Sequence, residues 1–566
     1  MFLPTTREEM RKLSWDRLDV VIVTGDTYID SPYIGAAVIG KVLQAAGYKV
    51  GIISQPDTEN EKDITRLGEP ALFWGVTAGS IDSMVANYTA LKKRRRKDDF
   101  TPGGKNNKRP DRASIVYTNL IRKYFKNTVP IVLGGIEASL RRIAHYDYWD
   151  DRIRRAILFD AKADILVYGM GEKSILKLAG NLKTGNDWKN IRGICYISTH
   201  PREEFIILPS YQEVKENKKK FVSMFNDFYL NNDPLITKGL CQQQDSRYLI
   251  QNPPSYPLNR KELDEIYDLP YEREVHPYYR KEGEVEALKT IKFSISSHRG
   301  CYGECNFCSI TVHQGRIIQD RSEKSILKEV KLLTELGDFK GYILDVGGPT
   351  ANMYGIECSK KIKSGSCTDK RCLYPQICSS LKINHKKQME ILKKIRQIEE
   401  VKKVFVASGI RYDMLLGDQK YGEKYLRELV KYHISGQLKI APEHTEINVL
   451  EKMGKPNQGY LKKFRDKFLQ INKEQKKTQF LTYYLIVAHP GCREGDMVRL
   501  KEYTSKELKL TPEQVQIFTP TPSTYSTLMY YTERDPFTGK VIYVEKDLKK
   551  KERQKKILTE KKSKLQ

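Results

Sequence analysis

Six short apolar runs alternate with helix-like stretches in the second half of the chain. The runs cover residues 291–296, 341–346, 404–408, 437–441, 480–487 and 514–518. Helical periodicity lies between them, at 322–336, 385–400, 420–433, 445–474 (with a break at Gly454) and 494–508. Apolar runs of this kind are typical of strands buried in a parallel sheet. The alternation predicts an α/β fold that contains a partial, six-stranded (β/α) barrel.

Each predicted strand is followed by a glycine-rich or polar motif. In chain order, the motifs are the Cys301–Cys308 loop, Gly347-Gly348-Pro349-Thr350, Gly409-Ile410-Arg411, Pro442-Glu443-His444, His489-Pro490-Gly491 and Thr519-Pro520-Thr521-Pro522. In (β/α) barrels the chemistry takes place at the carboxyl ends of the strands. The motifs therefore predict a functional site at this end of the barrel.

The loop after the first run carries Cys301, Cys305 and Cys308 at C-x3-C-x2-C spacing. Three thiolates this close can hold three corners of a 4Fe-4S cluster and leave one iron open. The alternative is a zinc site, although zinc sites usually offer two C-x2-C pairs or a Cys/His mix. The spacing resembles that of radical SAM enzymes. The resemblance implies that the open iron chelates S-adenosylmethionine (SAM), which one electron cleaves to a 5′-deoxyadenosyl radical.

A second cysteine group follows, at x8, x4 and x5 spacing. It consists of Cys358, Cys367, Cys372 and Cys378. Four thiolates within twenty-one residues suit an auxiliary iron–sulfur cluster or a tetrahedral zinc. Four free thiols in an insertion are the alternative. We expect a metal that orders a cover over the barrel mouth.

The N-terminal half begins with a β-α-β pattern over 19–24, 34–46 and 49–53, and further strand-like runs lie at 71–75, 130–133 and 164–168. This pattern predicts a Rossmann-like domain without a G-x-G-x-x-G fingerprint. Many radical SAM enzymes carry such a domain for cobalamin, with the motif D-x-H-x-x-G. The corresponding stretch from Asp26 to Gly35 contains no histidine. We therefore expect a cobalamin-binding-like fold that does not ligate cobalt through histidine.

The composition indicates how the cysteines are used, where the protein is located and which partners its charge suits. Seven of the ten cysteines lie between Cys301 and Cys378, which favours metal ligation over disulfides. No apolar run is long enough to span a membrane, and no signal-like segment opens the chain, so a cytoplasmic location is expected. The net charge of +27 suits phosphate-rich partners or a solvated surface, and we expect the basic stretch 92–112 to be an exposed loop.

Taken together, the motifs resemble the YgiQ family of radical SAM proteins over nearly the whole chain. The resemblance rests on Val23-Thr24-Gly25-Asp26, on the stretches 299–301 and 308–310, and on Gly347 to Met353, Ala441 to His444 and Phe518 to Pro522. It implies that Phe307 packs near the adenine and that Gly347, Gly348, Pro349 and Thr350 replace the G-G-E motif, whose backbone binds the SAM amino group. Weaker candidates for SAM contacts are Ser408, Arg411, Lys439 and Glu443, for which salt bridges or strand-end caps are alternatives.

The sequence divides into four expected segments. These are a Rossmann-like domain at 1–200, a connecting region at 201–285, a radical SAM barrel at 286–540 with a cysteine-rich insertion at 351–380, and a basic tail at 541–566 that forms a solvated helix or is disordered. The first hypothesis is a radical SAM enzyme with an unassigned substrate and a flavodoxin or ferredoxin as electron donor. The alternatives are a radical SAM enzyme that modifies RNA, for which no RNA-binding motif is evident, and a non-enzymatic protein that binds metal or nucleic acid.

Overall fold

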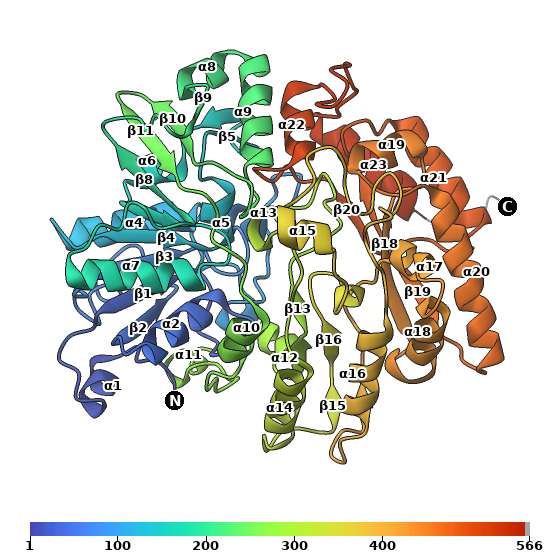
Figure 1. Ribbon diagram of the computed structural model, residues 1–566, viewed down its shortest axis with the longest axis horizontal. Coiled ribbons are helices and arrows are strands. Elements are labelled where there is room, and N and C mark those ends of the chain that lie inside the picture. The colour runs from blue at the N-terminus through green and yellow to red at the C-terminus, as the bar shows by residue number, and fades with distance from the viewer. Residues whose placement is uncertain (561–566) are drawn as a thin grey trace. The chain divides into compact units, whose positions relative to one another are not determined.

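The computed structural model describes residues 1–560, which separate into two compact units. Unit 1 comprises Met1–Lys292 and Val312–Gly315, and unit 2 comprises Phe293–Thr311 and the chain from Arg316 onward. Figure 1 shows the elements of both units in chain order. None of the helices in the described part of the chain has the length and apolarity that crossing a membrane requires.

Unit 1 is built on one nine-stranded sheet. Its strands are β1 (Val20–Thr24), β2 (Val50–Ser54), β3 (Phe73–Thr77), β4 (Ile131–Gly134), β7 (Ile165–Val167), β8 (Ile194–Ser198), β9 (Ile206–Leu208), β10 (Leu240–Gln244) and β11 (Arg247–Gln251). The order is β2-β1-β3-β4-β7-β8-β11-β10-β9, and the first five strands are mutually parallel. The parallel part has the flavodoxin-like order, in which the connection reverses direction between β1 and β3. The Rossmann-like expectation is confirmed.

Helices cover both faces of this sheet. The helices of unit 1 are α1 (Arg7–Lys12), α2 (Gly35–Ala45), α3 (Ser83–Asn87), η1 (Pro102–Gly104), α4 (Ala113–Tyr124), α5 (Gly135–Leu140), α6 (Ile157–Ala161), α7 (Glu172–Thr184), α8 (Tyr211–Glu216), α9 (Lys218–Leu230), α10 (Arg260–Tyr267), α11 (Pro277–Arg280) and α12 (Glu286–Ile291). Helices α2 and α7 lie on one face and α4 on the other (Figure 1). A short hairpin of β5 (His145–Asp147) and β6 (Arg152–Arg154) completes the unit.

Two stretches of unit 1 differ from the sequence-based expectation. Residues 201–285, expected as a connecting region, supply β9, β10 and β11 to the main sheet. The stretch 92–112, expected as an exposed loop, is exposed over 92–97 but buries Asp98, Thr101, Asn106 and Arg109 further along. In each stretch some buried polar side chains bond to residues outside it, as Thr101 does to Gln55 and Gln242 does to Ala144.

Unit 2 contains the expected alternation of parallel strands and helices. The strands are β12 (Ser294–Ser296), β15 (Tyr342–Ile343), β16 (Asp345–Gly347), β17 (Lys403–Val404), β18 (Gln437–Glu443), β19 (Phe480–Val487) and β20 (Val515–Ile517). Parallel pairing joins β12 to β16, β15 to β17, and β18 through β19 to β20, and a parallel bridge joins Ile410 to Ile440. Strands therefore neighbour one another in chain order, as in an open (β/α) barrel. A small hairpin of β13 (His298–Arg299) and β14 (Gln319–Asp320) flanks the cysteine loop.

The helices of unit 2 match most of the predicted ranges. They are α13 (Ile310–Gln314, shared with unit 1), α14 (Glu323–Thr334), η2 (Ala351–Met353), α15 (Ser359–Ser364), α16 (Lys386–Arg396), α17 (Tyr412–Gly417), α18 (Gly422–Glu428) continued by the π-helix η3 (Leu429–His433), α19 (Ile447–Met453), α20 (Gln458–Glu474), α21 (Glu494–Lys506), α22 (Tyr525–Thr532) and α23 (Leu548–Thr559). The predicted break at Gly454 separates α19 from α20, and this glycine has φ +65°.

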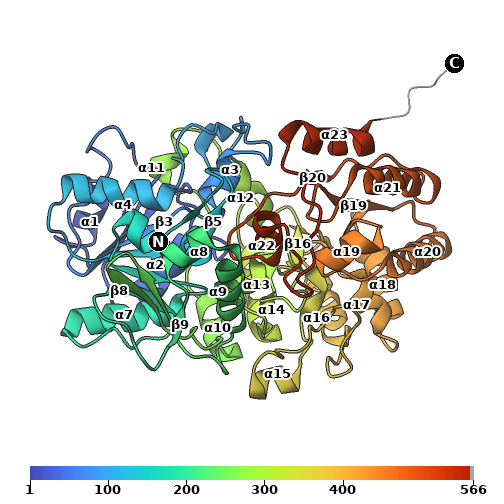
Figure 2. The same ribbon diagram turned by 90° about the horizontal axis from the view of Figure 1, so that it is seen from above.

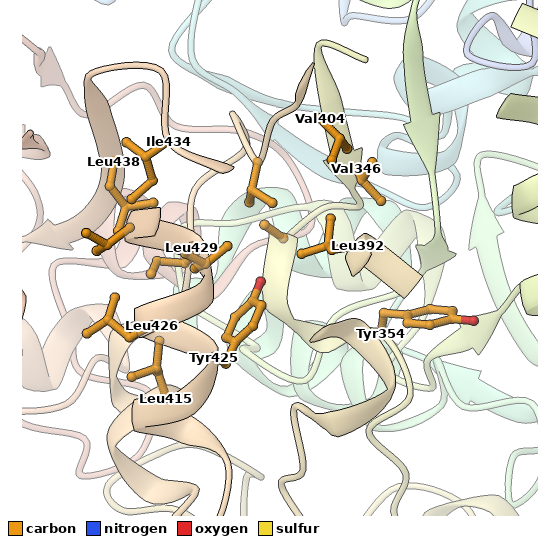
Figure 3. Packing of buried hydrophobic residues seen from close by; sticks show 14 of the residues in the cluster. Val346, Tyr354, Leu392, Val404, Leu415, Tyr425, Leu426, Leu429, Ile434 and Leu438 are labelled. Carbon is orange, nitrogen blue, oxygen red and sulfur yellow. The ribbon is translucent and has the colours of Figure 1, made fainter. Parts of the chain in front are cut away.

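The core of unit 2 lies between strands and helices. Figure 3 shows Val346 and Val404 from the strands facing Leu392 of α16, with Tyr425, Leu426 and Leu429 close by. The apolar faces read from the sequence are therefore the buried ones, and packing of this core fixes the strand ends that carry the motifs.

The basic C-terminal stretch forms a helix, which was one of its two expected forms, but one face of this helix is packed and not solvated. Helix α23 lies beside α21 (Figure 2). It buries Lys551, Gln554 and Leu558. The Lys551 ammonium donates to the Tyr530 hydroxyl at 2.9 Å, and the Gln554 Oε1 accepts from the Ala488 backbone at 3.0 Å. Residues 561–566 of the predicted tail lie outside the described part of the chain.

Candidate active site at the cysteine loop

Two thiols of the first cysteine group, those of Cys301 and Cys305, lie beside Gly303. A Cβ atom at this glycine would lie 3.2 Å from Sγ of Cys301 and 3.7 Å from Sγ of Cys305. Burial, with a contribution from Cys305, raises the pKa of Cys308 to about 12. The donor set is three thiols, the ligand type that iron–sulfur clusters use. The residues therefore fit a cluster in kind, and binding it requires deprotonation and some rotation of the thiols, because among residues 1–560 no three potential ligands are preassembled around a metal position.

Two predicted residues from other strand ends reach this loop. Thr350, after β16, places its Oγ1 3.7 Å from Sγ of Cys301. Arg411, after β17, places Nη1 3.5 Å from Sγ of Cys305 and holds Asp413 through two hydrogen bonds. The Asn352 side chain fixes the Arg411 backbone, accepting from its N–H at 2.7 Å and donating to its carbonyl at 3.0 Å. A cation therefore lies beside the cysteine loop in a fixed orientation.

Glu443, at the end of β18, forms a second buried ion pair. The Lys455 ammonium lies 3.4 Å from the Glu443 carboxylate and donates to the Ala441 carbonyl at 2.8 Å. Burial raises the pKa of Glu443, and Lys455 opposes that rise. Glu443 has φ +68°, a conformation that side-chain-bearing residues rarely adopt and that clusters at functional sites. Lys455 also lies 5.9 Å from the Phe307 ring, which links Glu443 to the cysteine loop.

The remaining residues predicted to contact SAM bond to groups other than the cysteines of the loop. The Ser408 hydroxyl donates to Asp345, which also accepts from the Ser408 backbone at 3.1 Å, so this serine acts as a strand-end cap. Lys439 lies on β18, and its carbonyl accepts from the Ile410 backbone at 3.1 Å. Phe307 contacts the ring of His489 edge-on, with centroids 6.3 Å apart.

The cysteines of the second group differ in burial and in the pKa of their thiols. Cys358 and Cys372 are buried in one cluster with Tyr302, Met353 and Leu373, and Cys378 lies at its edge. Burial raises the pKa of Cys372 to about 11, whereas the Ser380 backbone lowers that of Cys378. The insertion that carries them includes α15, which lies at the bottom of the view in Figure 2. These four residues remain a predicted metal site.

Glu304 connects this insertion to the cysteine loop. Its carboxylate lies 3.0 Å from Nε of Arg316 and 3.8 Å from the buried ammonium of Lys361 on α15. Its carbonyl accepts from Arg371 at 3.0 Å. The insertion and the loop are therefore held together by charge before any metal is present.

The sequence analysis does not single out three residues of the site: Asn352, Asp413 and Lys455. Asn352 lies within the stretch Gly347 to Met353, and Asp413 lies two residues beyond Arg411, so proximity to a motif is the available signal. Lys455 follows α19 and has no local motif, and its role depends on its contact with the end of β18.

In unit 1, the edge where parallel-sheet ligands bind is filled by the chain itself. The Arg109 guanidinium lies 2.8 Å from Oδ1 of Asp26 after β1, 3.1 Å from Oδ2 of Asp98, and 2.6 Å from the Ala78 carbonyl after β3. A Cβ atom at Gly79 would lie 2.1 Å from Oδ1 of Asp26, so the two strand-end loops are in direct contact. These loops flank the topological switch point, where doubly wound sheets bind their ligands.

Solved structures share this architecture. The radical S-adenosylmethionine methyltransferase TsrM from Kitasatospora setae aligns with a TM-score of 0.51 at 14% identity, over 89% of this chain and 75% of that chain. The cobalamin-dependent S-adenosylmethionine radical enzyme OxsB aligns with a TM-score of 0.51 at 13% identity, over 93% of this chain and 57% of that chain. The likeness confirms the predicted fold class.

OxsB was solved with aqua-cobalamin, but the residues at the switch point of unit 1 do not fit this cofactor, because Arg109, Asp26 and Asp98 pair with one another there. His276, whose ring stacks on Tyr28 with centroids 5.5 Å apart, has both ring nitrogens engaged, Nδ1 by the Tyr278 N–H and Nε2 by Glu9 at 3.1 Å.

Sequence relatives define the family. The profile described as Radical SAM N-terminal matches residues 2–294, and a domain of unknown function matches residues 513–563. A UPF0313 protein of Fusobacterium nucleatum is 60% identical, with 99% of both chains covered. A UPF0313 protein of Thermotoga maritima is 52% identical, with 97% of both chains covered. The chain therefore belongs to the UPF0313 family of radical SAM enzymes.

Proposed function

We propose that this chain is a YgiQ-type radical SAM protein in which Cys301, Cys305 and Cys308 hold a 4Fe-4S cluster whose open iron binds SAM. The cluster and SAM, when bound, would supply a 5′-deoxyadenosyl radical after reduction by one electron. The observation that carries the proposal is that Thr350 lies beside Cys301 and Arg411 beside Cys305, so two further strand ends meet the cysteine loop. A flavodoxin or ferredoxin is the proposed source of the electron.

The chain's own residues would hold and shield these groups. Arg411 supplies positive charge beside the loop, where the cluster thiolates would be anionic. The Thr350 hydroxyl lies beside Cys301, and the backbone of Gly347, Gly348, Pro349 and Thr350 would bind the polar end of SAM. Phe307 offers an aromatic face for the adenine, and the Glu443–Lys455 pair offers a carboxylate and an ammonium for the ribose or carboxylate of SAM.

The second cysteine group is proposed to bind an auxiliary iron–sulfur cluster or a zinc ion. The support is its anchoring to the cysteine loop through Glu304, Lys361 and Arg371. A metal here would stiffen the insertion beside the first site.

Anaerobic reconstitution with iron and sulfide, followed by an assay for 5′-deoxyadenosine with dithionite, tests the main proposal. We expect cleavage of SAM by the wild type and none by the Cys301→Ala, Cys305→Ala, Cys308→Ala triple variant. The matched control is Cys241→Ala, a buried cysteine in unit 1. Undiminished cleavage in the triple variant would contradict the assignment. Adding RNA to the same assay tests RNA as substrate, since a true substrate would be modified as the radical is consumed.

A further inference from the structure

A buried histidine of unit 2 lies between a carboxylate and an amide. His385, directly before α16, places its Nδ1 2.8 Å from Oδ2 of Asp418 and its Nε2 3.1 Å from the side-chain nitrogen of Asn352. His385 and Asn352 are 0% exposed, and Asp418 is 5% exposed. The ring of Tyr425, which belongs to the core shown in Figure 3, stacks on His385 with centroids 5.0 Å apart. Segments that are far apart in the chain therefore meet at this imidazole.

The backbone of Arg411 fixes the direction of each hydrogen bond in this group. The Arg411 N–H can only donate, so it must face Oδ1 of Asn352, at 2.7 Å. The Asn352 amide nitrogen donates one hydrogen to the Arg411 carbonyl, at 3.0 Å, and its other hydrogen is directed to Nε2 of His385. Nε2 is therefore the acceptor, and the neutral ring carries its proton on Nδ1, from which it donates to Asp418.

The Asp418 carboxylate is fixed by the backbone around it. It accepts from the N–H groups of His385 at 2.8 Å, Lys420 at 3.2 Å and Tyr421 at 2.9 Å. Burial acts to raise the pKa of Asp418, but the hydrogen bonds from His385 and Tyr421 lower it overall. The carboxylate is thus ionised at neutral pH, and it keeps Nε2 of His385 turned toward Asn352.

The other end of this hydrogen-bonded chain meets the cysteine loop. Asp413 takes two of the three guanidinium nitrogens of Arg411, Nε at 2.8 Å and Nη2 at 2.5 Å. The remaining nitrogen, Nη1, lies 3.5 Å from Sγ of Cys305. Asn352 holds the backbone of Arg411 and Asp413 holds its guanidinium, so both ends of the arginine determine where Nη1 points.

We propose that His385 is a positioning residue of the cluster site: through Asn352 it holds Arg411 so that Nη1 donates to Cys305, which raises the reduction potential of the cluster. The inference rests on the proposed function, because it assumes that Cys305 ligates iron. Reduction adds one negative charge to a cluster, and hydrogen bonds to the sulfur ligands favour the reduced state. Residues that orient such donors tune a metal site without contacting it.

The test is the midpoint potential of the reconstituted cluster, measured by anaerobic redox titration with EPR in the absence of SAM. His385→Leu removes the acceptor for Asn352 and should lower the potential by about 59 mV, a tenfold change in the equilibrium constant of a one-electron couple. His385→Gln can accept from Asn352 and donate to Asp418, so it should restore most of the potential. The matched control is His433→Leu, at a buried histidine of η3 that donates to the Val404 carbonyl at 2.8 Å, and it should leave the potential unchanged.

A second background separates this route from a general loss of structure. The double variant Arg411→Gln, Asp413→Asn has no guanidinium beside the loop, so adding His385→Leu to it should shift the potential no further. Wild type that takes up no cluster would refute the proposed function itself. A loaded wild type with the same potential as His385→Leu, or a shift that persists without Arg411, would overturn this inference alone. If His385→Leu fails to load iron, Asn352→Ala replaces it, and a potential equal to that of the wild type would again overturn the inference.

Discussion

Nη1 of Arg411 lies 3.5 Å from Sγ of Cys305, and the same guanidinium is paired with Asp413. Both side chains are buried. The protein thus brings a cation to the cysteine loop and neutralises it with a carboxylate from the next helix. Substituting either Arg411 or Asp413 should therefore change the electrostatic environment of the cysteine loop.

Replacing Arg411 by glutamine should destabilise unit 2 by about 3–5 kcal/mol, because it leaves the Asp413 carboxylate buried and unpaired. The double variant Arg411→Gln, Asp413→Asn should recover most of this loss, since no isolated charge remains. Urea unfolding followed by far-UV circular dichroism measures both. A double variant as unstable as the single one would contradict the charge-pair explanation.

Acid should weaken unit 2 through its buried histidines. Burial, assisted by the Arg499 charge, lowers the pKa of His444 to about 3. The unfolded imidazole titrates near about 6.5. Below that pH the unfolded state binds the extra proton, so stability should fall as the pH drops from 6.5 towards 3, by about 1.4 kcal/mol per pH unit for one such group.

His444→Gln should make this pH dependence shallower. Hydrogen exchange of peptides from β18 and β19 between pH 7 and pH 5, corrected for the intrinsic exchange rate, reports the local stability. His200→Gln, at an exposed position in unit 1, is the control. An unchanged slope in His444→Gln would show that this residue is not the titrating group.

The Arg109 network should stabilise unit 1 strongly. Arg109→Ala leaves Asp26 and Asp98 buried without their partner and should cost about 3–5 kcal/mol. Lys97→Ala, at an exposed position of the same segment, should change stability by less than about 0.5 kcal/mol. Fluorescence from the tryptophans, all of which lie in unit 1, follows urea unfolding of this unit. Equal effects of the two variants would argue against a buried network.

Hydroxocobalamin should not be retained at the switch point of the wild type. The crevice is filled by Arg109, and His276 has both ring nitrogens engaged. Gel filtration after incubation, with absorbance at the corrin bands, measures retention. A bound cobalamin whose reduced form gives a nitrogen-split EPR signal that a histidine substitution removes would refute this prediction.

Metal analysis of the Cys301, Cys305, Cys308 triple alanine variant isolates the second cysteine group. Residual iron and sulfide, about four irons per chain for a full cubane, would indicate an auxiliary cluster, and one zinc would indicate a structural site. Adding Cys358→Ala and Cys372→Ala should remove the residual metal. Protein prepared without oxygen that contains neither metal would mean that these cysteines are free thiols.

Strands could be predicted from the sequence where nearly every residue of the strand is apolar and the whole segment lies in the sheet. Residues 480–487 read as an apolar run and form β19 at the same bounds. The break at Gly454 was visible because a glycine interrupted helical periodicity. Strand-end motifs then placed Thr350 and Arg411 at the cysteine loop, because the barrel topology brings carboxyl ends together.

The features that could not be predicted from the sequence depend on contacts between residues that are far apart in the chain. Strand β10 reads Leu-Cys-Gln-Gln-Gln, which is not apolar, yet Gln242 and Gln244 are buried because their amides bond to Ala144, Ala156 and the Pro209 carbonyl. Arg109 lies in a basic stretch, and only the fold brings Asp26 to it.

The Glu304 carboxylate pairs with Arg316 and with Lys361 of the insertion, and its backbone carbonyl accepts from Arg371. The buried carboxylate is therefore stabilised only while Arg316 and Lys361 are present, which constrains how the family can diverge. Among relatives, an acidic residue at this position should be retained or lost together with the lysine of the insertion, as contacting pairs covary. Relatives that shorten the insertion should also replace the acid, so the history of the second cysteine group should be traceable from a single position in the first loop.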